Sequence, residues 1–493
     1  MLAGIDVGST GLKVSLFSEE GERLHCAYRA YSLEYRKGGR VTISPEVWWK
    51  SLCGCFAELE SQCDLRRIEA IGISHANALI PTDKDMQAPF DAIMQMDQRG
   101  GCMVERISRE FGEERIFSIT GNRNAAGFLW GPTLKWLQER EEAFGSVCYL
   151  FTPSSYLVMR LTGVYSMDHT RAATTMLYDL ERGSWSQDLC DYFHISREMC
   201  PPLFGSQEIV GRTKKTEGLC LPDGIPVTVG CMDTVAAMQG MAAGQEETVL
   251  ILGSVGRFAA YPARLDRRFL NTQLPDRSRR ISMTPVNNAG IAVRWIRDVL
   301  FRCPEEGNYR EMDAMAEHVP AASEGLFFFP YLTGSTCPHW EPAARGAFLG
   351  MEAFHTAGHY ARAVLEGVGF SLWENMKILE QESGARIDRI YTGGGGAKSR
   401  VWLQILSDIF QKELIVPEHL ETETMGSAML AGMGTGRLSQ GDLVCWNKPR
   451  EYILPRREYA EAYLRAAETF RELHPALEQA GNIIGRRAAK ERV

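Results

Sequence analysis

A short glycine turn between two apolar runs occurs twice in this chain of 493 residues. The first copy spans residues 2–17 and contains Asp6, Gly8 and Gly11, and the second spans residues 249–258. Glycines let backbone N–H groups come close to an anion, and a carboxylate beside them suits a hydrated metal ion that accompanies phosphates. One copy would fit an ordinary hairpin of an α/β protein. Two copies in order predict a duplicated fold with a phosphate-binding hairpin in each half.

Length and composition indicate a two-domain protein. A chain of this length exceeds one hydrophobic core, and the restart of the pattern places the predicted boundary between the domains 1–244 and 245–493. The 45% hydrophobic fraction is interrupted by charge, and the N-terminus lacks a basic region followed by an apolar stretch. We therefore expect a cytoplasmic protein without a membrane segment.

Charge and cysteine content argue against nucleic-acid binding and against a cysteine zinc site or disulfide framework. A net charge of −8 gives no footprint for nucleic acid, and the basic cluster at residues 277–280 is short. The thirteen cysteines are scattered, and Cys53 and Cys55 lack zinc-ligand spacing. The cysteines are expected to be reduced and mostly buried.

The apolar periodicity predicts an α/β fold in which strands alternate with helices. Residues 264–280 are rich in loop-forming residues, and the C-terminal helix is expected to end in a frayed, charged tail. The predicted helices cover residues 47–60, 355–383, 399–411, 424–433 and 457–480, and the predicted strands include residues 68–74, 224–230, 325–332 and 387–392.

Two further features indicate ligand chemistry. Four glycines at residues 393–396 follow a strand and precede a helix, which favours a flat ligand lying against bare backbone. Asp233 ends a buried strand at the start of an alanine-rich helix, where an acid can serve as an N-cap. Its position just before the domain boundary favours catalysis instead, because a carboxylate there can accept the proton of a hydroxyl that attacks phosphorus.

A family resemblance joins these features. Gly-Ala-Phe-Leu-Gly-Met at residues 346–351 is followed, after seven residues, by His-Tyr-Ala-Arg-Ala-Val-Leu-Glu-Gly at residues 359–367. In residue type and spacing this resembles the C-terminal signature of the FGGY family of carbohydrate kinases. Further matches run along nearly the whole chain, for example Met-Asp-Gln-Arg at residues 96–99. The superfamily includes actin, Hsp70-type chaperones and hexokinase.

The resemblance implies two RNase H-like, actin-like ATPase domains flanking a deep catalytic cleft, with the sugar held mainly by the first domain and ATP by the second. It assigns Asp233 as the catalytic base, and Asp6 with Asp233 as the carboxylates of a Mg²⁺ site. The residues implied for ATP are Gly8, Ser9, Thr10 and Lys13 in the first phosphate loop, Gly253, Ser254 and Gly256 in the second, and Gly394, Gly395, Gly396 and Ser399 at the adenosine.

The residues expected at the sugar depart from the family pattern. Xylulose kinases of the family commonly have Gly-Gln-Met-His-Gly where this chain has His75-Ala76-Asn77-Ala78, so D-xylulose itself is in doubt. Gln95 and Thr234 also differ from the family, whereas Asp97 and Arg99 are retained and could hold vicinal hydroxyls or form a structural salt bridge. The residues expected to contact the sugar are His75, Asn77, Asp97, Arg99, Asp233 and Thr234.

The resemblance thus predicts an ATP-dependent kinase of a ketose, a pentulose such as xylulose above others, or of a related polyol. Glycerol is disfavoured because Gly100 stands where glycerol kinases carry the glutamate of an Arg-Glu pair. A catalytically silent sugar-binding regulator and a chaperone-type ATPase are the alternatives, and the sequence leaves the phosphorylated hydroxyl open. A homodimer is compatible with the family, although no segment identifies an interface.

Overall fold

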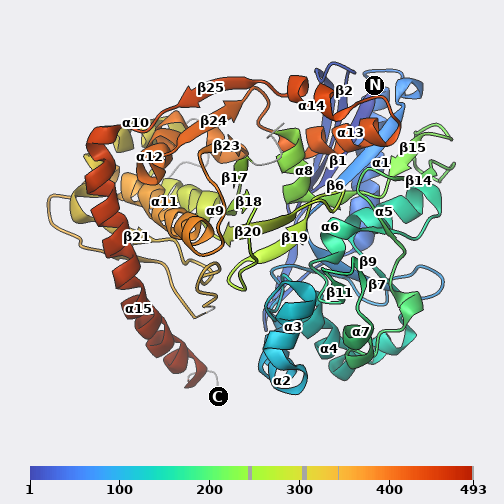
Figure 1. The fold of residues 1–493 in the computed structure, drawn as a ribbon, viewed down its shortest axis with the longest axis horizontal. Coiled ribbons are helices and arrows are strands. Elements are labelled where there is room, and N and C mark those ends of the chain that lie inside the picture. Colours follow the sequence, from blue (N-terminus) through green and yellow to red (C-terminus); the bar gives the residue numbers. More distant parts are fainter. Residues whose placement is uncertain (242–246, 302–307, 342, 491–493) are drawn as a thin grey trace. The chain divides into compact units, whose positions relative to one another are not determined.

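Two β-sheets with the same strand connectivity form the framework of the protein (Figure 1). The computed structural model describes residues 1–241, 247–301, 308–341 and 343–490. The chain divides into a first unit of Met1–Ala242, Leu270–Ile281 and Thr422–Asn447 and a second unit of Ala243–Phe269, Ser282–Glu421 and Lys448–Val493. The predicted boundary between residues 244 and 245 lies outside the described residues and stays a prediction.

The sheet of the first unit has the strand order β14-β15-β6-β1-β2-β3, with β16 also paired to β6. The hairpin of β1 and β2 is antiparallel, and β3 pairs antiparallel with β2. On the other side, β6 pairs parallel with β1, and β15 and β16 each pair parallel with β6. The strands are β1 (Leu2–Val7), β2 (Gly11–Phe17), β3 (Arg23–Ala30), β6 (Ala70–His75), β14 (Ile209–Arg212), β15 (Pro226–Thr228) and β16 (Cys231–Met232).

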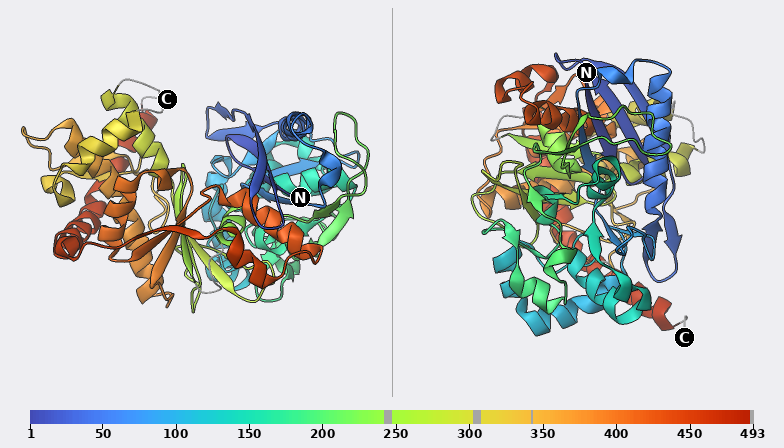
Figure 2. Two further views of the ribbon diagram at one scale, coloured as in Figure 1. Left: turned by 90° about the horizontal axis from the view of Figure 1, so that it is seen from above. Right: turned by 90° about the vertical axis from the view of Figure 1, so that its right-hand side faces the viewer.

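Helices cover both faces of this sheet. Because side chains alternate along a strand, Ala3, Ile5 and Val7 share one face, where they pack in a core with residues of α1 (Pro45–Glu60) and α5 (Pro153–Thr162). On the other face lies α13 (Thr422–Gly434), which is red in Figure 2 beside the blue strands. Its backbone comes so close that a Cβ on Gly4 would lie 1.7 Å from the Thr424 carbonyl oxygen. Glycine on β1 therefore permits the approach that brings the start of α13 to the sheet.

The first unit also contains a smaller sheet of order β4-β5-β8-β7-β9 and several short elements. Its strands are β4 (Glu34–Arg36), β5 (Arg40–Ile43), β7 (Ala78–Thr82), β8 (Ala92–Met94) and β9 (Tyr149–Phe151). The remaining strands are β10 (Met167–Asp168), β11 (Tyr178–Asp179), β12 (Ser184–Trp185), β13 (Leu203–Phe204) and β19 (Leu270–Gln273). The remaining helices are α2 (Val104–Ile107), α3 (Glu113–Thr120), α4 (Trp130–Arg140), α6 (His169–Ala172), α7 (Gln187–Tyr192), α8 (Asp233–Gly240) and α14 (Gln440–Trp446).

The sheet of the second unit repeats the connectivity of the first. Its order β25-β24-β23-β17-β18-β20 corresponds strand by strand to β14-β15-β6-β1-β2-β3, with the same parallel and antiparallel pairs. The strands are β17 (Thr248–Leu252), β18 (Gly256–Ala260), β20 (Arg280–Val286), β23 (Arg389–Gly393), β24 (Glu413–Pro417) and β25 (Pro449–Ile453). The predicted α/β class and the duplicated fold are confirmed.

Five helices and one hairpin complete the described part of the second unit. They are α9 (Ala289–Phe301), α10 (Asn308–Glu317), α11 (Ala357–Gln381), α12 (Arg400–Phe410), α15 (Ala460–Lys490), and the strands β21 (Phe327–Phe329) and β22 (Ala347–Leu349). Residues of α11, α12 and α15 pack in one hydrophobic core with the sheet. The second half of the signature therefore lies in α11, at the centre of this core.

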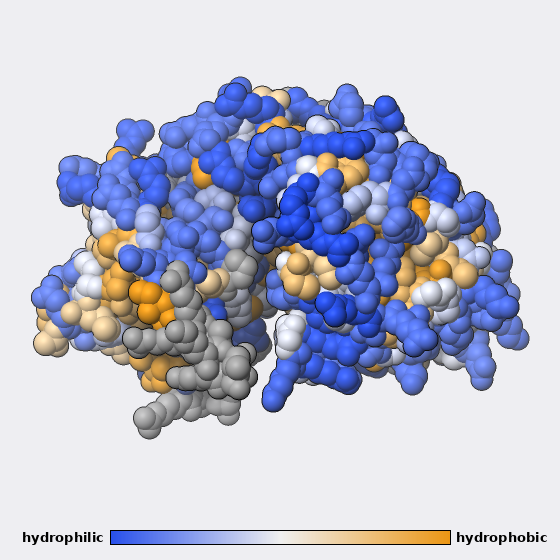
Figure 3. All heavy atoms as spheres, turned by 90° about the horizontal axis from the view of Figure 1, so that it is seen from below, coloured by the Kyte–Doolittle hydropathy of each residue, from blue (hydrophilic) through white to orange (hydrophobic). Residues whose placement is uncertain are grey.

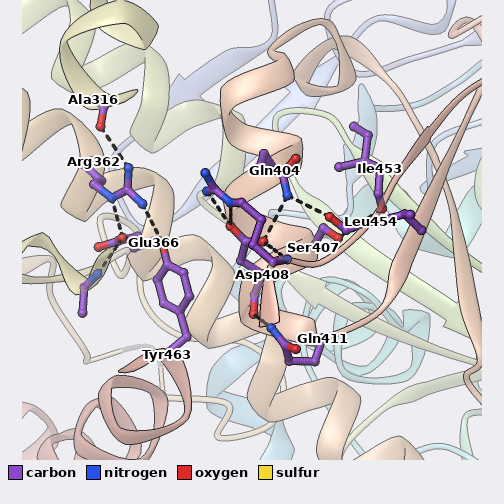
Figure 4. A network of polar contacts seen from close by, with 12 residues as sticks. Ala316, Arg362, Glu366, Gln404, Ser407, Asp408, Gln411, Ile453, Leu454 and Tyr463 are labelled. Atoms are coloured by element: carbon purple, nitrogen blue, oxygen red, sulfur yellow. Dashed lines mark hydrogen bonds and ion pairs between the residues drawn. The ribbon is translucent and has the colours of Figure 1, made fainter. Parts of the chain in front are cut away.

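Two signature residues of α11 form a buried polar network (Figure 4). The Nε of Arg362 donates to Glu366 at 2.7 Å, and both side chains are 5% exposed or less. Tyr463 of α15 donates to Glu366 at 2.8 Å and accepts from Arg362 at 2.7 Å. Glu366 also accepts from the Ser323 hydroxyl at 2.6 Å. The signature arginine and glutamate thus fasten α11 to α15 and to the loop before β21.

The structure differs from the sequence expectations at several places. The loop-rich region 264–280 contains the strand β19, and the C-terminal helix continues to Lys490 instead of fraying after residue 480. Residues 422–447 belong to the first unit although they follow most of the second in the chain. Among the described residues, no helix has both the length and the apolar composition needed to cross a bilayer. Hydrophilic residues cover most of the face drawn in Figure 3.

Candidate active site

Asp6 lies at the carboxyl end of β1, on the face of the sheet that α13 covers. Its residue partner on the parallel strand β6 is Ser74, whose hydroxyl donates to the Asp6 carboxylate at 2.8 Å. Burial and the neighbouring carboxylate of Glu423 raise the pKa of Asp6 to about 8, with a further contribution from Asp233 and opposition from Ser74 and Lys13. A buried carboxylate beside two others favours a bound cation.

Asp233 is the first residue of α8, directly after β16. The backbone N–H of Thr234 donates to its Oδ1 at 2.7 Å, and the Thr234 hydroxyl lies 3.3 Å from the same atom. Arg171 is a neighbouring cation, whose Nη2 lies 3.7 Å from Oδ1. The Asp233 side chain is 15% exposed, so it is largely but not completely buried.

Arg171 contacts both His75 and Asp233. Its guanidinium is 4% exposed and donates from Nη2 to the His75 carbonyl at 2.7 Å, while it faces Asp233. Its backbone N–H donates to Asp168, the N-cap of α6. Hydrogen bonds of both the backbone and the side chain of Arg171 therefore hold the guanidinium in position.

His75 ends β6 and is fully buried. Burial, followed by the charge of Arg171, lowers its pKa well below the usual value, so the imidazole is neutral. Its Nδ1 lies 2.9 Å from the Ala76 carbonyl oxygen, and its Nε2 makes no hydrogen bond within the described residues. His75 thus offers one ring nitrogen for a further polar partner.

The first predicted phosphate loop is the turn between β1 and β2, which holds Gly8, Ser9 and Thr10. The N–H of Gly8 donates to the Gly11 carbonyl at 3.0 Å, and the Tyr31 hydroxyl donates to the Gly8 carbonyl at 2.6 Å. Lys13 is the residue partner of Asp6 across the hairpin, and its charge lowers the pKa of that carboxylate. This short turn next to Asp6 is therefore held in place by the Tyr31 hydroxyl.

Asn77, Asp97 and Arg99 are held by neighbouring groups of the same unit. Asp97 is fully buried, accepts from the Val41 N–H at 2.8 Å, and forms an ion pair with Arg99 at 3.0 Å. The Asn77 amide donates to the Phe128 carbonyl at 2.6 Å, and its Oδ1 makes no hydrogen bond within the described residues. The ion pair accounts for both charges without a ligand, and the predicted sugar contacts of these three residues stay predictions.

In the second unit, Gly253 and Ser254 lie in the turn between β17 and β18, and Gly256 is the first residue of β18. The N–H of Gly290, near the start of α9, donates to the Gly253 carbonyl at 3.1 Å. A Cβ on Gly256 would lie 2.9 Å from that of Ala289. The second hairpin is thus packed against a helix N-terminus, which carries partial positive charge.

The glycine cluster follows β23. Gly394 has φ +88° and donates from its N–H to the Leu420 carbonyl at 3.1 Å, whereas a Cβ on Gly395 would meet nothing within 4 Å. A Cβ on Gly396 would lie 2.6 Å from the Trp402 ring. Ser399 caps α12 by accepting from the Trp402 N–H at 3.1 Å. Conformation, packing and capping account for three of these residues, and the backbone at Gly395 is open.

Each unit therefore gathers part of the predicted residues. Asp6, Gly8, Lys13, His75, Asp233 and Thr234 lie around the carboxyl ends of β1, β6 and β16. Sequence reasoning missed Ser74, Arg171 and Glu423 at this site. Glu423 has the appearance of an ordinary acid in the first turn of a helix, and nothing in the sequence around Arg171 distinguishes it.

The residues present fit a hydrated divalent cation. The charges of Glu423 and Asp233 both contribute to the raised pKa of Asp6, so both carboxylates act on Asp6. Arg171 lies near Asp233, and Lys13 acts on Asp6 in the opposite direction. Oxygen ligands in a carboxylate cluster are those that Mg²⁺ prefers.

Comparison with known proteins agrees with this geometry. The chain matches the N-terminal domain of the FGGY family of carbohydrate kinases over residues 1–240 and the C-terminal domain over residues 265–435. It is 30% identical over 482 residues to a xylulose kinase of Bacillus subtilis strain 168, which covers 95% of this chain and 92% of that protein. It is also 31% identical over 476 residues to a glycerol kinase of Thermus brockianus, which covers 92% of this chain and 94% of that protein.

A solved structure shows the same fold. The crystal structure of ligand-bound xylulose kinase from Lactobacillus acidophilus has a TM-score of 0.90 at 24% identity, over 98% of this chain and 99% of that chain. The two-unit architecture is that of a two-domain ATPase of the actin-like class. The chain belongs to the FGGY family of carbohydrate kinases, and it is a phosphotransferase for which the family implies ATP as the phosphate donor.

Proposed function

We propose that this protein transfers the γ-phosphate of ATP to a hydroxyl of a ketose or related polyol, with a pentulose such as xylulose as the favoured substrate. The observation that carries the proposal is the pairing of Asp233 with Arg171 beside the buried carboxylate of Asp6. A partly exposed carboxylate at the start of α8 can accept a proton from a bound hydroxyl.

In the proposed reaction Asp233 takes the proton of the acceptor hydroxyl while that oxygen attacks the γ-phosphorus. Thr234 and Arg171 hold the carboxylate in position, because the former donates to Oδ1 and the latter lies 3.7 Å from it. Phosphoryl transfer depends on alignment and charge neutralisation more than on covalent chemistry. One base with donors that hold it in position is therefore sufficient to activate the acceptor hydroxyl.

Asp6 and Asp233 would hold the hydrated Mg²⁺, with Glu423 as a further carboxylate close to Asp6. When bound, the ion neutralises negative charge on the phosphates of ATP. Gly8 and Lys13 on the first unit, and the turns at Gly253 and Gly395 on the second, are the proposed contacts to the nucleotide. The open backbone at Gly395 is the place where a flat base can approach most closely.

The preference for a ketose rests on the relatives and on the residues near Asp233. The similar proteins include xylulose kinases. Neutral His75 and the Oδ1 of Asn77, which has no hydrogen-bond partner among the described residues, are groups of the kind that select sugar hydroxyls. The glycerol kinase of Thermus brockianus is as similar in overall identity, so identity alone does not separate the substrates. A small set of polar side chains has to make that distinction.

A coupled ADP-release assay with ATP and Mg²⁺ across pentuloses, hexuloses, aldoses and polyols tests the proposal. We expect turnover to be highest with one ketose and to be low with glycerol. Highest turnover with glycerol or gluconate would overturn the substrate class. Absence of turnover on the whole panel, with ATP still bound, would favour a sugar-binding regulator instead.

A further inference from the structure

A second group of ligand-type side chains lies in the second unit and has no part in the proposed reaction. His339 and Glu341 come from the loop between β21 and β22, and His474 comes from α15. One ligand atom of each residue lies within 4.8 Å of those of the other two. Two imidazoles and a carboxylate are a common set of protein ligands for Zn²⁺.

Two of these groups have an atom without a hydrogen-bond partner among the described residues. His474 is 4% exposed and the Glu341 side chain is 22% exposed, and neither Nε2 of His474 nor Oε2 of Glu341 makes a hydrogen bond within the described part of the chain. The two atoms lie 3.4 Å apart. Two ligands bound to one tetrahedral zinc ion, each at about 2.1 Å, are separated by about 3.4 Å. Their spacing therefore already matches that of two ligands of one ion.

A polar group lies beside each imidazole. Oε2 of Glu374 lies 3.1 Å from Nε2 of His339, and the Tyr331 hydroxyl lies 3.1 Å from Nδ1 of His474. Metal-binding histidines typically bond to a carboxylate or another polar group through the nitrogen that does not hold the ion.

The two imidazoles are stacked in the structure. Their centroids are 3.5 Å apart and their planes differ by 17°. One ion in the plane of both rings requires one ring to turn, and we expect this of His339, whose side chain is 24% exposed against 5% for His474. Stacking of the two rings without an ion is the alternative that the experiment below must exclude.

We propose that His339, Glu341 and His474 bind a divalent cation of the zinc type, with Glu374 and Tyr331 orienting the two imidazoles and water completing the coordination. The ion would join α15 to the loop between β21 and β22 and, through Glu374, to α11. It is a structural site, separate from the carboxylates of the first unit.

Zinc binding to the full, untagged chain tests this proposal. The protein is treated with a chelator, freed of it, and titrated with ZnCl₂ at pH 7.5 by calorimetry, with bound zinc measured by atomic spectroscopy after gel filtration. We expect one zinc per chain and a higher midpoint of thermal unfolding when zinc is bound. His339→Ala, Glu341→Gln and His474→Asn should each weaken zinc binding at least ten-fold, and Glu374→Gln about ten-fold or more.

The exposed His318, directly after α10, provides the matched control, and His318→Ala should leave zinc affinity and the zinc-dependent shift in unfolding unchanged. His339→Ala is the variant least affected by loss of packing, because His339 is more exposed than His474. Circular dichroism and gel filtration confirm that each variant is folded. Unchanged zinc affinity in the folded His339→Ala and Glu341→Gln proteins, or no zinc bound to the original protein, would overturn the proposal.

Discussion

At the scale of single residues, the account depends on a few buried charges in the first unit. Asp6 and Asp233 are held by hydrogen bonds from Ser74 and Thr234, and Arg171 provides the cation next to Asp233. Burying charges is costly unless partners are present. A buried cluster of carboxylates is a place where a bound cation lowers the electrostatic cost of burial.

Arg171 gives a test of this arrangement. Arg171→Met removes the donor to the His75 carbonyl and the cation beside Asp233, so both the base and the end of β6 lose their alignment. We expect kcat to fall by about 10²-fold, the scale of a misplaced catalytic group, with little change in ATP affinity. Steady-state kinetics measure both. Arg182→Met, at a side chain that is 82% exposed, is the control, and equal kinetics for the two variants would show that Arg171 has no positioning role.

His169 gives a prediction about stability and pH. Burial lowers its pKa to about 4, while an unfolded chain has the ordinary value near 6.5. The unfolded state therefore binds a proton first as pH falls, and the folded state loses stability between about pH 6.5 and pH 4. His169→Gln should flatten this part of the profile, as measured by urea unfolding at a series of pH values. The control is His318→Gln. If the stability of His169→Gln falls as steeply with pH as that of this control, His169 is not the group responsible.

At the scale of elements, close backbone contacts place the starts of α8 and α13 near the carboxyl ends of the strands. A Cβ on Gly72 of β6 would lie 1.9 Å from the Ser427 carbonyl oxygen of α13, and one on Gly426 would lie 1.8 Å from the Ala236 carbonyl oxygen of α8. These distances are too short for any side chain. The glycines set how closely Glu423 and Asp233 approach Asp6.

Gly72→Ala tests this packing. The added methyl group must push α13 away from β6, so we expect a loss of about 1–3 kcal/mol in the free energy of unfolding together with lower kcat. Gly145→Ala adds the same methyl group where nothing lies within 4 Å and should be close to neutral. Denaturant unfolding compares the two. Equal stability of both variants would mean that the approach of α13 is not limited by glycine.

The signature of α11 has a structural explanation in the network of Figure 4. Glu366→Gln leaves the buried guanidinium of Arg362 without its carboxylate, and the main-chain N–H of Ala322 loses a charged acceptor. We expect a loss of about 3–5 kcal/mol in the free energy of unfolding. Glu461→Gln removes an exposed i,i+4 ion pair with Arg465 and should cost less than about 0.5 kcal/mol. A small effect of both changes would show that the network does not stabilise α11.

Much of the element pattern could be predicted from the sequence, because apolar periodicity and glycine turns are local signals. The hairpins at residues 2–17 and 249–258, the helix α11 and the strand β23 are examples. Arg171 and Glu423 could not be found in this way, since their roles depend on contacts across more than sixty positions of chain. The sugar residues His75, Asn77, Asp97 and Arg99 stay predictions for the same reason.

At the scale of the whole molecule, two units of the same topology carry different candidate functional residues. The first unit holds the carboxylates and the second holds the glycine cluster. The return of residues 422–447 to the first unit means that the chain crosses between the units several times, and no local pattern marks this return. A change in α13 therefore affects the first unit although its sequence position is late.

The most direct test of the central claim is the turnover of Asp233→Asn with the best sugar of the panel, measured together with ATP affinity. The account predicts a fall in kcat of about 10²–10⁴-fold, the usual contribution of a general base, with the Kd for ATP changed by no more than about two-fold. The amide retains the size of the side chain, so a folding defect is not expected. Turnover close to that of the original protein would contradict the claim that Asp233 is the base.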